Sequence, residues 1–378
     1  MTRWNPNLYL REGRQKGYAR NYLSALIGAG KAMDAAGVPV VFSLSHLANY
    51  SRTRYSDLHA FVARTGLGRA DYPYKNFTIK KRSGGRRWIS VPAPPLMAVQ
   101  DWIAQNILNK ITPHPAACAY VIGRSTKDHA ARHCAADWVV KVDITDFFSN
   151  ISERQVYDLF LALGYTKLLS FEMARLCTRV TPRRQGPRWT VQAGDYGIDD
   201  YQCRYIGSLP QGAPTSPALS NLVCRNMDTD LEAIATRYGA TYSRYADDLC
   251  FSLVESSRAV AFDLKKDVSK ILWCHSFAEN EKKTRIIPPG ARKLLTGLIV
   301  NGEHPTVPKE IRDVVRMHLY YCRKQGIPRH CRRRGFRSVI GLRNHLYGLI
   351  MYINAIDRSH GAKLLQEFGE LPWVDFDL

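Results

Sequence analysis

Three aspartates at the ends of short predicted strands constrain this chain most. Asp143 closes a largely apolar stretch over 138–142, and Asp247 and Asp248 lie in a tight turn between predicted strands over 241–245 and 249–253. Short apolar runs bounded by turn residues are typical of buried strands. Carboxylates beside such strands are costly to bury unless a positive charge compensates them. The pattern predicts a cation site, with an ordinary polar Asp-Asp turn as the alternative.

Magnesium is the cation that such a site suits best. Mg²⁺ prefers one or two carboxylates together with phosphate oxygens and water. Two such ions about 3.5–4 Å apart activate a 3′-hydroxyl and stabilise leaving pyrophosphate in an in-line displacement. Two Mg²⁺ ions, with Mn²⁺ as the alternative, are therefore the predicted cofactors.

The order of predicted elements indicates an α+β fold. Helical spacing covers 18–36, 44–65 and 96–111, and a hairpin turning at Ser83, Gly84 and Gly85 stands between the second and third of these stretches. A capping-box pair, Ser152 and Gln155, predicts a helix that ends near Gly164. A single helix is predicted from Ser216 to Gly239, and 181–207 reads as a loop or hairpin insertion. This order predicts an antiparallel sheet with helices on one face.

The charge of the chain favours a polyanionic partner. Its formal net charge is +21. Residues 281–343 hold sixteen Lys or Arg and four acidic residues, a net of +12, including Arg332, Arg333 and Arg334. Phosphate neutralisation and counterion release reward such a surface, so a nucleic acid is the expected partner. A basic enzyme without a nucleic-acid role is the alternative.

Cysteine usage and targeting signals indicate a reducing cytoplasm. The nine cysteines have no regular spacing and form no CxxC pair, so neither a zinc ribbon nor a disulfide framework is predicted. The N-terminus lacks the apolar core of a signal peptide, and no apolar run is long enough to span a membrane. We therefore expect no membrane partner.

Five ordered motifs resemble those of reverse transcriptases. Residues 245–248 read Tyr-Ala-Asp-Asp, which resembles the YxDD signature of that family. Residues 142–148 resemble the first palm motif and 209–217 the loop and helix start on the substrate side. Residues 80–87 resemble the fingers hairpin and 281–285 the later lysine motif. The matches follow the family order over most of the chain.

This resemblance implies a right-handed fingers–palm–thumb polymerase. The implied division is a helical N-terminal segment over 1–70, fingers over 71–135, a palm over 136–300 and a basic, RNA-binding thumb over 301–378. Asp143 and Asp247 would bridge the two metals, with Asp248 in support. Lys283, with Lys282 as rival, would donate a proton to pyrophosphate. Deoxynucleoside triphosphates and an RNA template are the implied substrates.

The resemblance also implies a nucleotide pocket. Phe148 would be the steric gate that excludes a 2′-hydroxyl, while its neighbour Phe147 packs in the core. The remaining members of the pocket would be Gln211 and Gly212 beside the base and sugar, and Lys80 (or Lys81) and Arg87 on the triphosphate. Arg suits bidentate contact with phosphate. Each of these cations could instead be an exposed hairpin charge.

Within the reverse transcriptases, the chain most resembles the retron enzymes. Residues 128–133 stand where retrons carry NAxxH, with His129 in place of Asn and His133 retained. The pair His129 and His133 lacks the Glu of HExxH, so helix-surface histidines or RNA contacts are expected rather than zinc. Residues 295–297, Leu-Thr-Gly, resemble the retron VTG element, where Thr296 and Gly297 would read the cognate RNA. A strand bend is the alternative reading of Thr296 and Gly297.

A retron identity implies specific partners. Such an enzyme copies part of its own structured noncoding RNA (msr–msd) from a 2′-hydroxyl primer, gives a branched RNA–DNA product, and in many systems acts with an effector protein against phage. A group II intron or abortive-infection enzyme is the nearest alternative, although intron enzymes normally extend further beyond the thumb. An inactive RNA-binding scaffold is disfavoured by the intact aspartates, and an RNA polymerase by the bulky Phe148.

Overall fold

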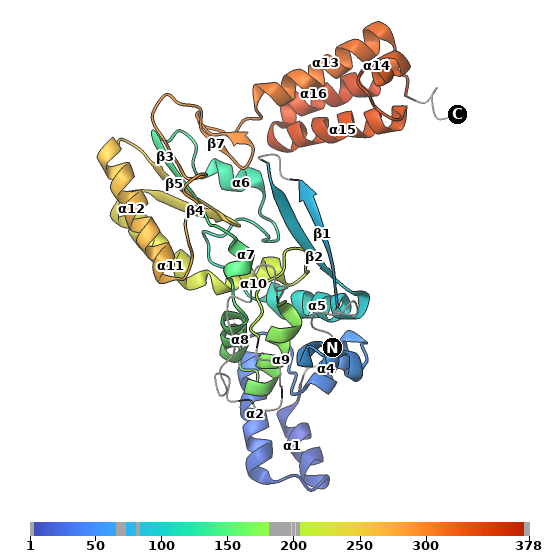
Figure 1. The fold of residues 1–378 in the computed structure, drawn as a ribbon, viewed down its shortest axis with the longest axis vertical. Coiled ribbons are helices and arrows are strands. Elements are labelled where there is room, and N and C mark those ends of the chain that lie inside the picture. Colours follow the sequence, from blue (N-terminus) through green and yellow to red (C-terminus); the bar gives the residue numbers. More distant parts are fainter. Residues whose placement is uncertain are drawn as a thin grey trace.

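The computed structural model describes residues 4–65, 73–80, 84–180, 198, 201 and 205–373. Lys81, Ser83 and most of the predicted insertion over 181–207 lie outside these ranges. The described chain is a mixed helical and sheet structure with three separate small sheets. Its elements form an elongated molecule, with the first helices at one end and the last helices at the other (Figure 1).

Four helices form the N-terminal segment: α1 (Pro6–Gln15), α2 (Arg20–Ala35), α3 (Leu44–Ser51) and α4 (Tyr55–Ala63). The two helical stretches predicted here are confirmed, but the second one is divided. Arg52 takes a left-handed backbone (φ 54°) that ends α3 before α4 begins. Helix α1 was predicted only as part of the helical segment over 1–70, although Asn5 caps it and Pro6 occupies its first turn.

A long hairpin and a helix follow this segment. Strands β1 (Tyr74–Lys80) and β2 (Arg86–Pro92) pair antiparallel, as predicted, with Phe77 opposite Ile89. Helix α5 (Pro94–Asn106) and the 3₁₀ turn η1 (Leu108–Lys110) cover the third predicted helical stretch. In Figure 1 the hairpin rises beside the central sheet toward the C-terminal helices. Helix α6 (Thr126–Ala131) then leads into the central sheet.

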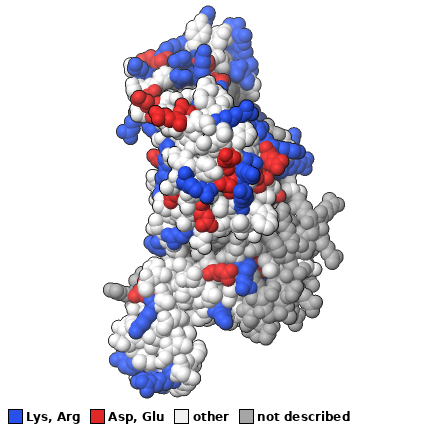
Figure 2. Space-filling view, turned by 90° about the vertical axis from the view of Figure 1, so that its left-hand side faces the viewer, with Lys and Arg blue, Asp and Glu red and all other residues white. Residues whose placement is uncertain are grey.

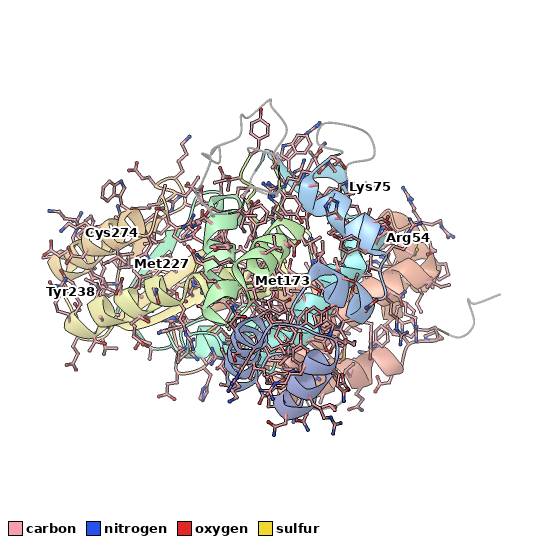
Figure 3. The ribbon with its side chains drawn as sticks, turned by 90° about the horizontal axis from the view of Figure 1, so that it is seen from below. Arg54, Lys75, Met173, Met227, Tyr238 and Cys274 are labelled. Atoms are coloured by element: carbon pink, nitrogen blue, oxygen red, sulfur yellow. The ribbon has the colours of Figure 1, made fainter. Side chains whose placement is uncertain are left out.

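The central sheet has the strand order β4–β5–β3–β6, and all of its pairs are antiparallel. The strands are β3 (Trp138–Asp143), β4 (Thr241–Tyr245), β5 (Asp248–Leu253) and β6 (Arg285–Ile287). Helices α11 (Arg225–Arg237) and α12 (Arg258–Cys274) pack against β4 and β3. Seen from below, Met227 on α11 and Cys274 on α12 lie on one side of the molecule, while Lys75 and Arg54 lie on the other (Figure 3). The predicted helix-covered antiparallel sheet is confirmed.

Alternation along the strands separates the two faces of this sheet. Val140, Val142, Leu249 and Phe251 are buried in the large core that α11 and α12 complete. The other face of the sheet holds Val139, Lys141 and Asp143 of β3. On β5, Cys250 pairs with Lys141 and Asp248 pairs with Asp143. Because side chains alternate along a strand, one face is apolar and the other holds the polar groups.

The helices that lie between β3 and β4 in the sequence connect this sheet to the N-terminal segment. They are α7 (Phe147–Asn150), α8 (Glu153–Ala162), α9 (Lys167–Cys177) and α10 (Ser216–Val223). The predicted capping box of Ser152 and Gln155 is present. The prediction of one helix from Ser216 to Gly239 is wrong, since a break at Cys224 separates α10 from α11. The apolar spacing continues across that break, which concealed it in the sequence.

The C-terminal part is helical and basic, as predicted. It comprises α13 (Lys309–Gln325), α14 (Ile327–Arg333), α15 (Val339–Ile356) and α16 (Arg358–Gly369). A second core joins these helices to Val139 and Cys250 of the central sheet and to the small hairpin of β7 (Leu294–Leu295) and β8 (Leu298–Ile299). Lys and Arg side chains crowd this end of the molecule in the space-filling view (Figure 2).

Candidate active site

The register of the central sheet brings the three predicted aspartates together. Asp143, the last residue of β3, pairs with Asp248, the first residue of β5. Asp247 lies in the two-residue turn between β4 and β5, and its carbonyl accepts a 2.9 Å hydrogen bond from the Ile144 amide. Ala246, the first turn residue, has φ 58°, as the tight turns of twisted hairpins require. The three aspartates thus lie together at one end of the two central strands.

The three carboxylates repel one another in a partly buried position. Asp143 is buried, while Asp247 and Asp248 are half-buried. Burial raises the pKa of the Asp247 carboxyl, and the charges of Asp248 and Asp143 raise it further. Burial likewise raises the pKa of Asp248, although Lys141, 3.9 Å away, opposes the shift. Such a cluster favours the binding of a cation.

Lys283 supplies one cation to this cluster. Its Nζ donates to both oxygens of Asp143, at 3.0 Å to Oδ1 and 2.8 Å to Oδ2. Partial burial opposes the charged form, but the hydrogen bonds and charge of Asp143 outweigh it and raise the pKa of Lys283. The segment that carries this lysine is tied to the end of β3, because the Asn280 amide donates to the Asp143 carbonyl at 2.7 Å. Lys282, the rival candidate, is exposed.

The predicted glycine of the substrate loop lies against the β1–β2 hairpin. The Ser90 amide of β2 donates to the Gln211 carbonyl at 2.8 Å. Gly212 has φ 115°, and a Cβ there would stand 2.9 Å from the Ile89 side chain. Only glycine satisfies both conditions without a shift of the hairpin. This contact fixes the hairpin relative to the loop that precedes α10.

The hairpin register separates the two predicted phosphate-binding cations. Arg87 pairs with Ile79, whereas Lys80 pairs with Arg86, so the two side chains leave opposite faces of the hairpin. Arg87 is close enough to Tyr120, beside Asp247, to lower the pKa of that phenol. Arg87 therefore lies on the hairpin face nearer Tyr120 and Lys80 on the other face, and the contact of both cations with the triphosphate stays a prediction. Turn geometry, which sets register, was not readable from the sequence.

Phe148 and Phe147 take different positions, as predicted. Phe147 is buried and contacts Phe277 with a ring-centroid distance of 5.9 Å. Phe148 is only half-buried, and its ring centroid lies 6.3 Å from that of Tyr120.

Tyr120 was missed by the sequence reasoning. It is 49% exposed and has φ 61°, and burial raises the pKa of its hydroxyl, with Asp247 contributing next. No periodicity marks its loop, so the sequence held no signal for it.

The expectation that His129 and His133 lie on a helix surface is wrong. Both are buried, at 1% and 0% exposure, because α6 packs on the polar face of the central sheet. The His133 ring bonds Ser252 Oγ at 2.8 Å and Ser243 Oγ at 2.6 Å, so it bridges β5 and β4. Direct contact of His133 with RNA is therefore incompatible with this conformation. Burial lowers the pKa of His129 to about 4 and that of His133 to about 3.

Thr296 and Gly297 form the turn of the β7–β8 hairpin. Both have positive φ, 45° and 87°, and the first value is costly for a β-branched residue. Thr296 Oγ1 donates to the Thr126 carbonyl of α6 at 3.4 Å. Thr296 and Gly297 therefore form a tight turn and not a bend within a strand. This turn contacts α6, the helix that begins the stretch resembling the retron NAxxH element.

The three consecutive arginines lie at the end of α14, and all are exposed. The Arg333 guanidinium is 5.9 Å from the centre of the Tyr321 ring. The prediction places RNA on this surface, and the exposure of Arg332, Arg333 and Arg334 leaves them free to contact it.

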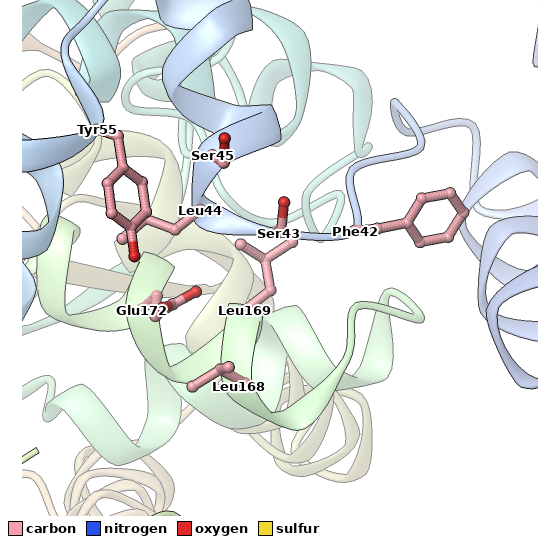
Figure 4. A pocket seen from close by; sticks show the side chains of 8 residues that line it. All are labelled: Phe42, Ser43, Leu44, Ser45, Tyr55, Leu168, Leu169 and Glu172. Carbon is pink, nitrogen blue, oxygen red and sulfur yellow. The ribbon is translucent and has the colours of Figure 1, made fainter. Parts of the chain in front are cut away.

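A pocket of about 310 Å³ lies apart from the predicted site residues, none of which lines it. It is formed by α3, α4 and α9, with Leu44, Tyr55 and Leu169 on its walls (Figure 4). Its acid, Glu172, accepts a 2.8 Å hydrogen bond from Tyr201. We assign this pocket no part in the chemistry of the aspartates. No helix within the described ranges is long and apolar enough to cross a membrane.

Comparison with known proteins defines the class first. Residues 79–296 match the family described as "Reverse transcriptase (RNA-dependent DNA polymerase)". This span contains β2, the central sheet and the aspartate cluster. The chain is thus an RNA-directed DNA polymerase with a fingers–palm–thumb fold.

Individual relatives then show which group of reverse transcriptases the chain resembles. The chain is 33% identical over 349 residues to the retron Mx162 reverse transcriptase of Myxococcus xanthus, covering 89% of this chain and 68% of the relative. It is 27% identical over 338 residues to the retron Ec86 reverse transcriptase of Escherichia coli, covering 88% and 94%. This chain belongs to the retron reverse transcriptases.

Proposed function

We propose that Asp143 and Asp247, with Asp248 in support, hold two Mg²⁺ ions for DNA synthesis. The oxygen-only donor set and the raised pKa values of Asp247 and Asp248 suit a hard cation. No group of three or more acidic, His or Cys ligands within the described ranges is arranged to hold a metal. Magnesium needs no such cage, because substrate phosphates and water complete its shell. When bound, the ions would activate the 3′-hydroxyl and stabilise pyrophosphate.

Lys283 has two roles in this proposal. In the free enzyme its ammonium compensates the Asp143 carboxylate, with which it shares two hydrogen bonds. With metal and nucleotide bound, Asp143 would hold the metal and Lys283 would face the leaving phosphates. There its proton can pass to the departing pyrophosphate oxygen, which is general acid catalysis.

The nucleotide pocket in this proposal lies between the fingers hairpin and the palm. Arg87 would bind the triphosphate, and the Gln211–Gly212 backbone would line the base and sugar. Phe148 would lie beneath the sugar and exclude a 2′-hydroxyl. Support comes from the contact of Ser90 with Gln211 and from the half-exposed Phe148 ring beside Tyr120. Lys80 leaves the other face of the hairpin, and its contact with the triphosphate stays part of this proposal.

The template in this proposal is a cognate structured noncoding RNA (msr–msd), copied from a 2′-hydroxyl primer into a branched RNA–DNA product. The exposed arginines of α14 and the strained turn of Thr296 and Gly297 support a dedicated RNA surface, since structured RNA is recognised largely by shape and phosphate. From the likeness to retron enzymes, we also propose that the protein acts in the cytoplasm against phage, together with an effector protein.

We propose the division into an N-terminal segment over 1–70, fingers over 71–135, palm over 136–300 and thumb over 301–378. The second core gives one refinement of it. Leu295 and Leu298 of the β7–β8 hairpin pack with the thumb helices, so this hairpin joins the thumb in packing although it precedes residue 301.

Loss of activity on removal of the carboxylates tests the metal site. Asp247→Asn with Asp248→Asn should abolish Mg²⁺-dependent DNA synthesis, while RNA binding persists. The matched control, Asp158→Asn with Asp263→Asn, removes two exposed carboxylates from other helices and should leave synthesis unchanged. Retained synthesis in the first variant would overturn the proposal.

A further inference from the structure

A buried arginine stands directly behind the aspartate turn. Arg244, the next-to-last residue of β4, has an exposed fraction of 0%. It lies on the apolar face of the palm sheet, between Tyr242 on its own strand and α11. A charged group in such a core needs full compensation. Asp228 on α11, also 0% exposed, provides it with two hydrogen bonds, from Nε at 2.8 Å and from Nη2 at 2.6 Å.

The third nitrogen of Arg244 reaches the turn itself. Nη1 donates to the Ala246 carbonyl at 3.3 Å and to Asn221 Oδ1, on α10, at 3.2 Å. One planar guanidinium thus joins α10, α11 and the peptide that precedes Asp247. Arg can do this because its donors project in a rigid fork.

The backbone of Arg244 is held as firmly as its side chain. Its amide donates to the Ala116 carbonyl and its carbonyl accepts from the Cys118 amide, both at 2.8 Å. Asn221 Nδ2 donates to the Ala119 carbonyl in the same segment, also at 2.8 Å. Tyr120, which lies beside Phe148, comes next in the chain. The network therefore reaches both the carboxylate turn and the aromatic side of the site.

Stability alone does not explain this ion pair. An apolar pair of similar volume in a protein core is often as stable as a buried salt bridge or more so. The distinguishing property of Arg244 is its bond to Ala246, a non-glycine residue in the left-handed region (φ 58°). Such a conformation costs about 1–2 kcal/mol and persists where surrounding contacts enforce it.

We infer that Arg244 is a positioning residue for the catalytic turn, clamped by Asp228, which sets the place of Asp247 and Asp248 through the Ala246 carbonyl. This inference rests on the proposed metal-binding role of these aspartates. A displaced turn would weaken metal binding and slow the chemical step, while nucleotide affinity, which depends on the fingers and Phe148, would be retained.

Arg244→Lys tests the inference, because lysine keeps the charge beside Asp228 but cannot also hold Ala246 and Asn221. We expect kcat to fall about 10- to 100-fold, as small displacements of catalytic groups do. The KM for deoxynucleotides should stay within about threefold, and the Mg²⁺ concentration for half-maximal activity should rise. Tyr242→Phe is the matched control. It removes a 2.8 Å hydrogen bond to the same Asp228 carboxylate without touching the turn, and should resemble the wild type.

Folding is monitored by thermal melting, with Arg244→Met plus Asp228→Leu as the second variant, since it removes both charges together. The inference is overturned if a folded Arg244 variant matches Tyr242→Phe in kcat and Mg²⁺ requirement. It is also overturned if both Arg244 variants unfold, because the pair is then structural only. Wild type and Asp247→Asn with Asp248→Asn are assayed in parallel. An active double-Asn variant would contradict the proposed function itself, whatever Arg244 does.

Discussion

Lys283 Nζ lies 2.8 Å from one carboxylate oxygen of Asp143 and 3.0 Å from the other. The lysine thus covers the carboxylate that the proposed mechanism requires for metal. It neutralises part of a cluster of three acids whose charges oppose one another. In the proposed mechanism Asp143 would hold the metal in place of this ammonium, so Lys283 would link metal binding to proton supply.

Lys283→Ala should therefore separate two effects. Without the competing ammonium, the free enzyme should bind Mg²⁺ more tightly, while single-turnover synthesis should slow about 100-fold because the proton donor is lost. Lys282→Ala, an exposed neighbour, is the control. Calorimetric titration with Mg²⁺ and quenched-flow synthesis measure the two effects. Equal behaviour of both variants would refute the assignment to Lys283.

Phe148→Ala should relax the choice of sugar. In the proposed pocket the ring would occupy the space of a 2′-hydroxyl, so its removal should raise incorporation of ribonucleotides relative to deoxynucleotides by at least about tenfold. Phe147→Leu changes the buried neighbour and should reduce stability without changing this ratio. Competition between the two kinds of nucleotide in single-step extension gives the ratio. No change with Phe148→Ala would exclude the steric-gate role.

Thr296→Ala should weaken binding of the cognate RNA more than binding of an unrelated RNA of equal length. Loss of one specific contact is worth about 1.4 kcal/mol, or tenfold in Kd. Thr306→Ala, an exposed threonine that follows the same hairpin, is the control. Filter binding at fixed salt compares the affinities of the wild type and both variants for the two RNAs. Equal losses for both RNAs would contradict specific reading by this turn.

The stability of the protein should fall as the pH drops below 6.5, in part through His133. Its pKa is lowered to about 3 in the folded protein, mainly by burial, so the unfolded chain takes up the proton first. The contribution of the neutral His133 ring to the free energy of unfolding is complete above about pH 6.5. It is lost as the pH falls toward 3, and the loss is about 2 kcal/mol at pH 5.

Urea unfolding at pH 7.5 and 5 measures this loss. His133→Gln should show a smaller drop in unfolding free energy between the two pH values than the wild type, and His304→Gln, on the surface, the same drop as the wild type. Identical drops in all three proteins would show that His133 is not buried in its neutral form.

Much of the palm was predictable because strand ends and turns leave local signals. Asp143 follows a short apolar run, and the two residues between β4 and β5 match the commonest hairpin loop length. Antiparallel pairing then brings Asp143 opposite Asp248 without further information. The capping box at Ser152 was equally local.

Tertiary contacts decided the rest. His129, in a six-residue helix without a clear apolar face, and His133, in the turn after it, were predicted to be surface residues, because their burial depends on the sheet beneath them. The hairpin face that Lys80 occupies could not be predicted, because side-chain parity in a hairpin depends on turn length. Arg244 passed unnoticed, since its partner Asp228 lies on another element.

The place of the metal is the most direct test of the central claim. Fe²⁺ bound in the Mg²⁺ position generates hydroxyl radicals with ascorbate and peroxide, which cut the nearest backbone. With RNA, primer and deoxynucleotide present, cleavage should centre on Asp143 and on the turn of Asp247 and Asp248, and excess Mg²⁺ should suppress it. Cleavage elsewhere, or unchanged cleavage after Asp247→Asn with Asp248→Asn, would contradict the account.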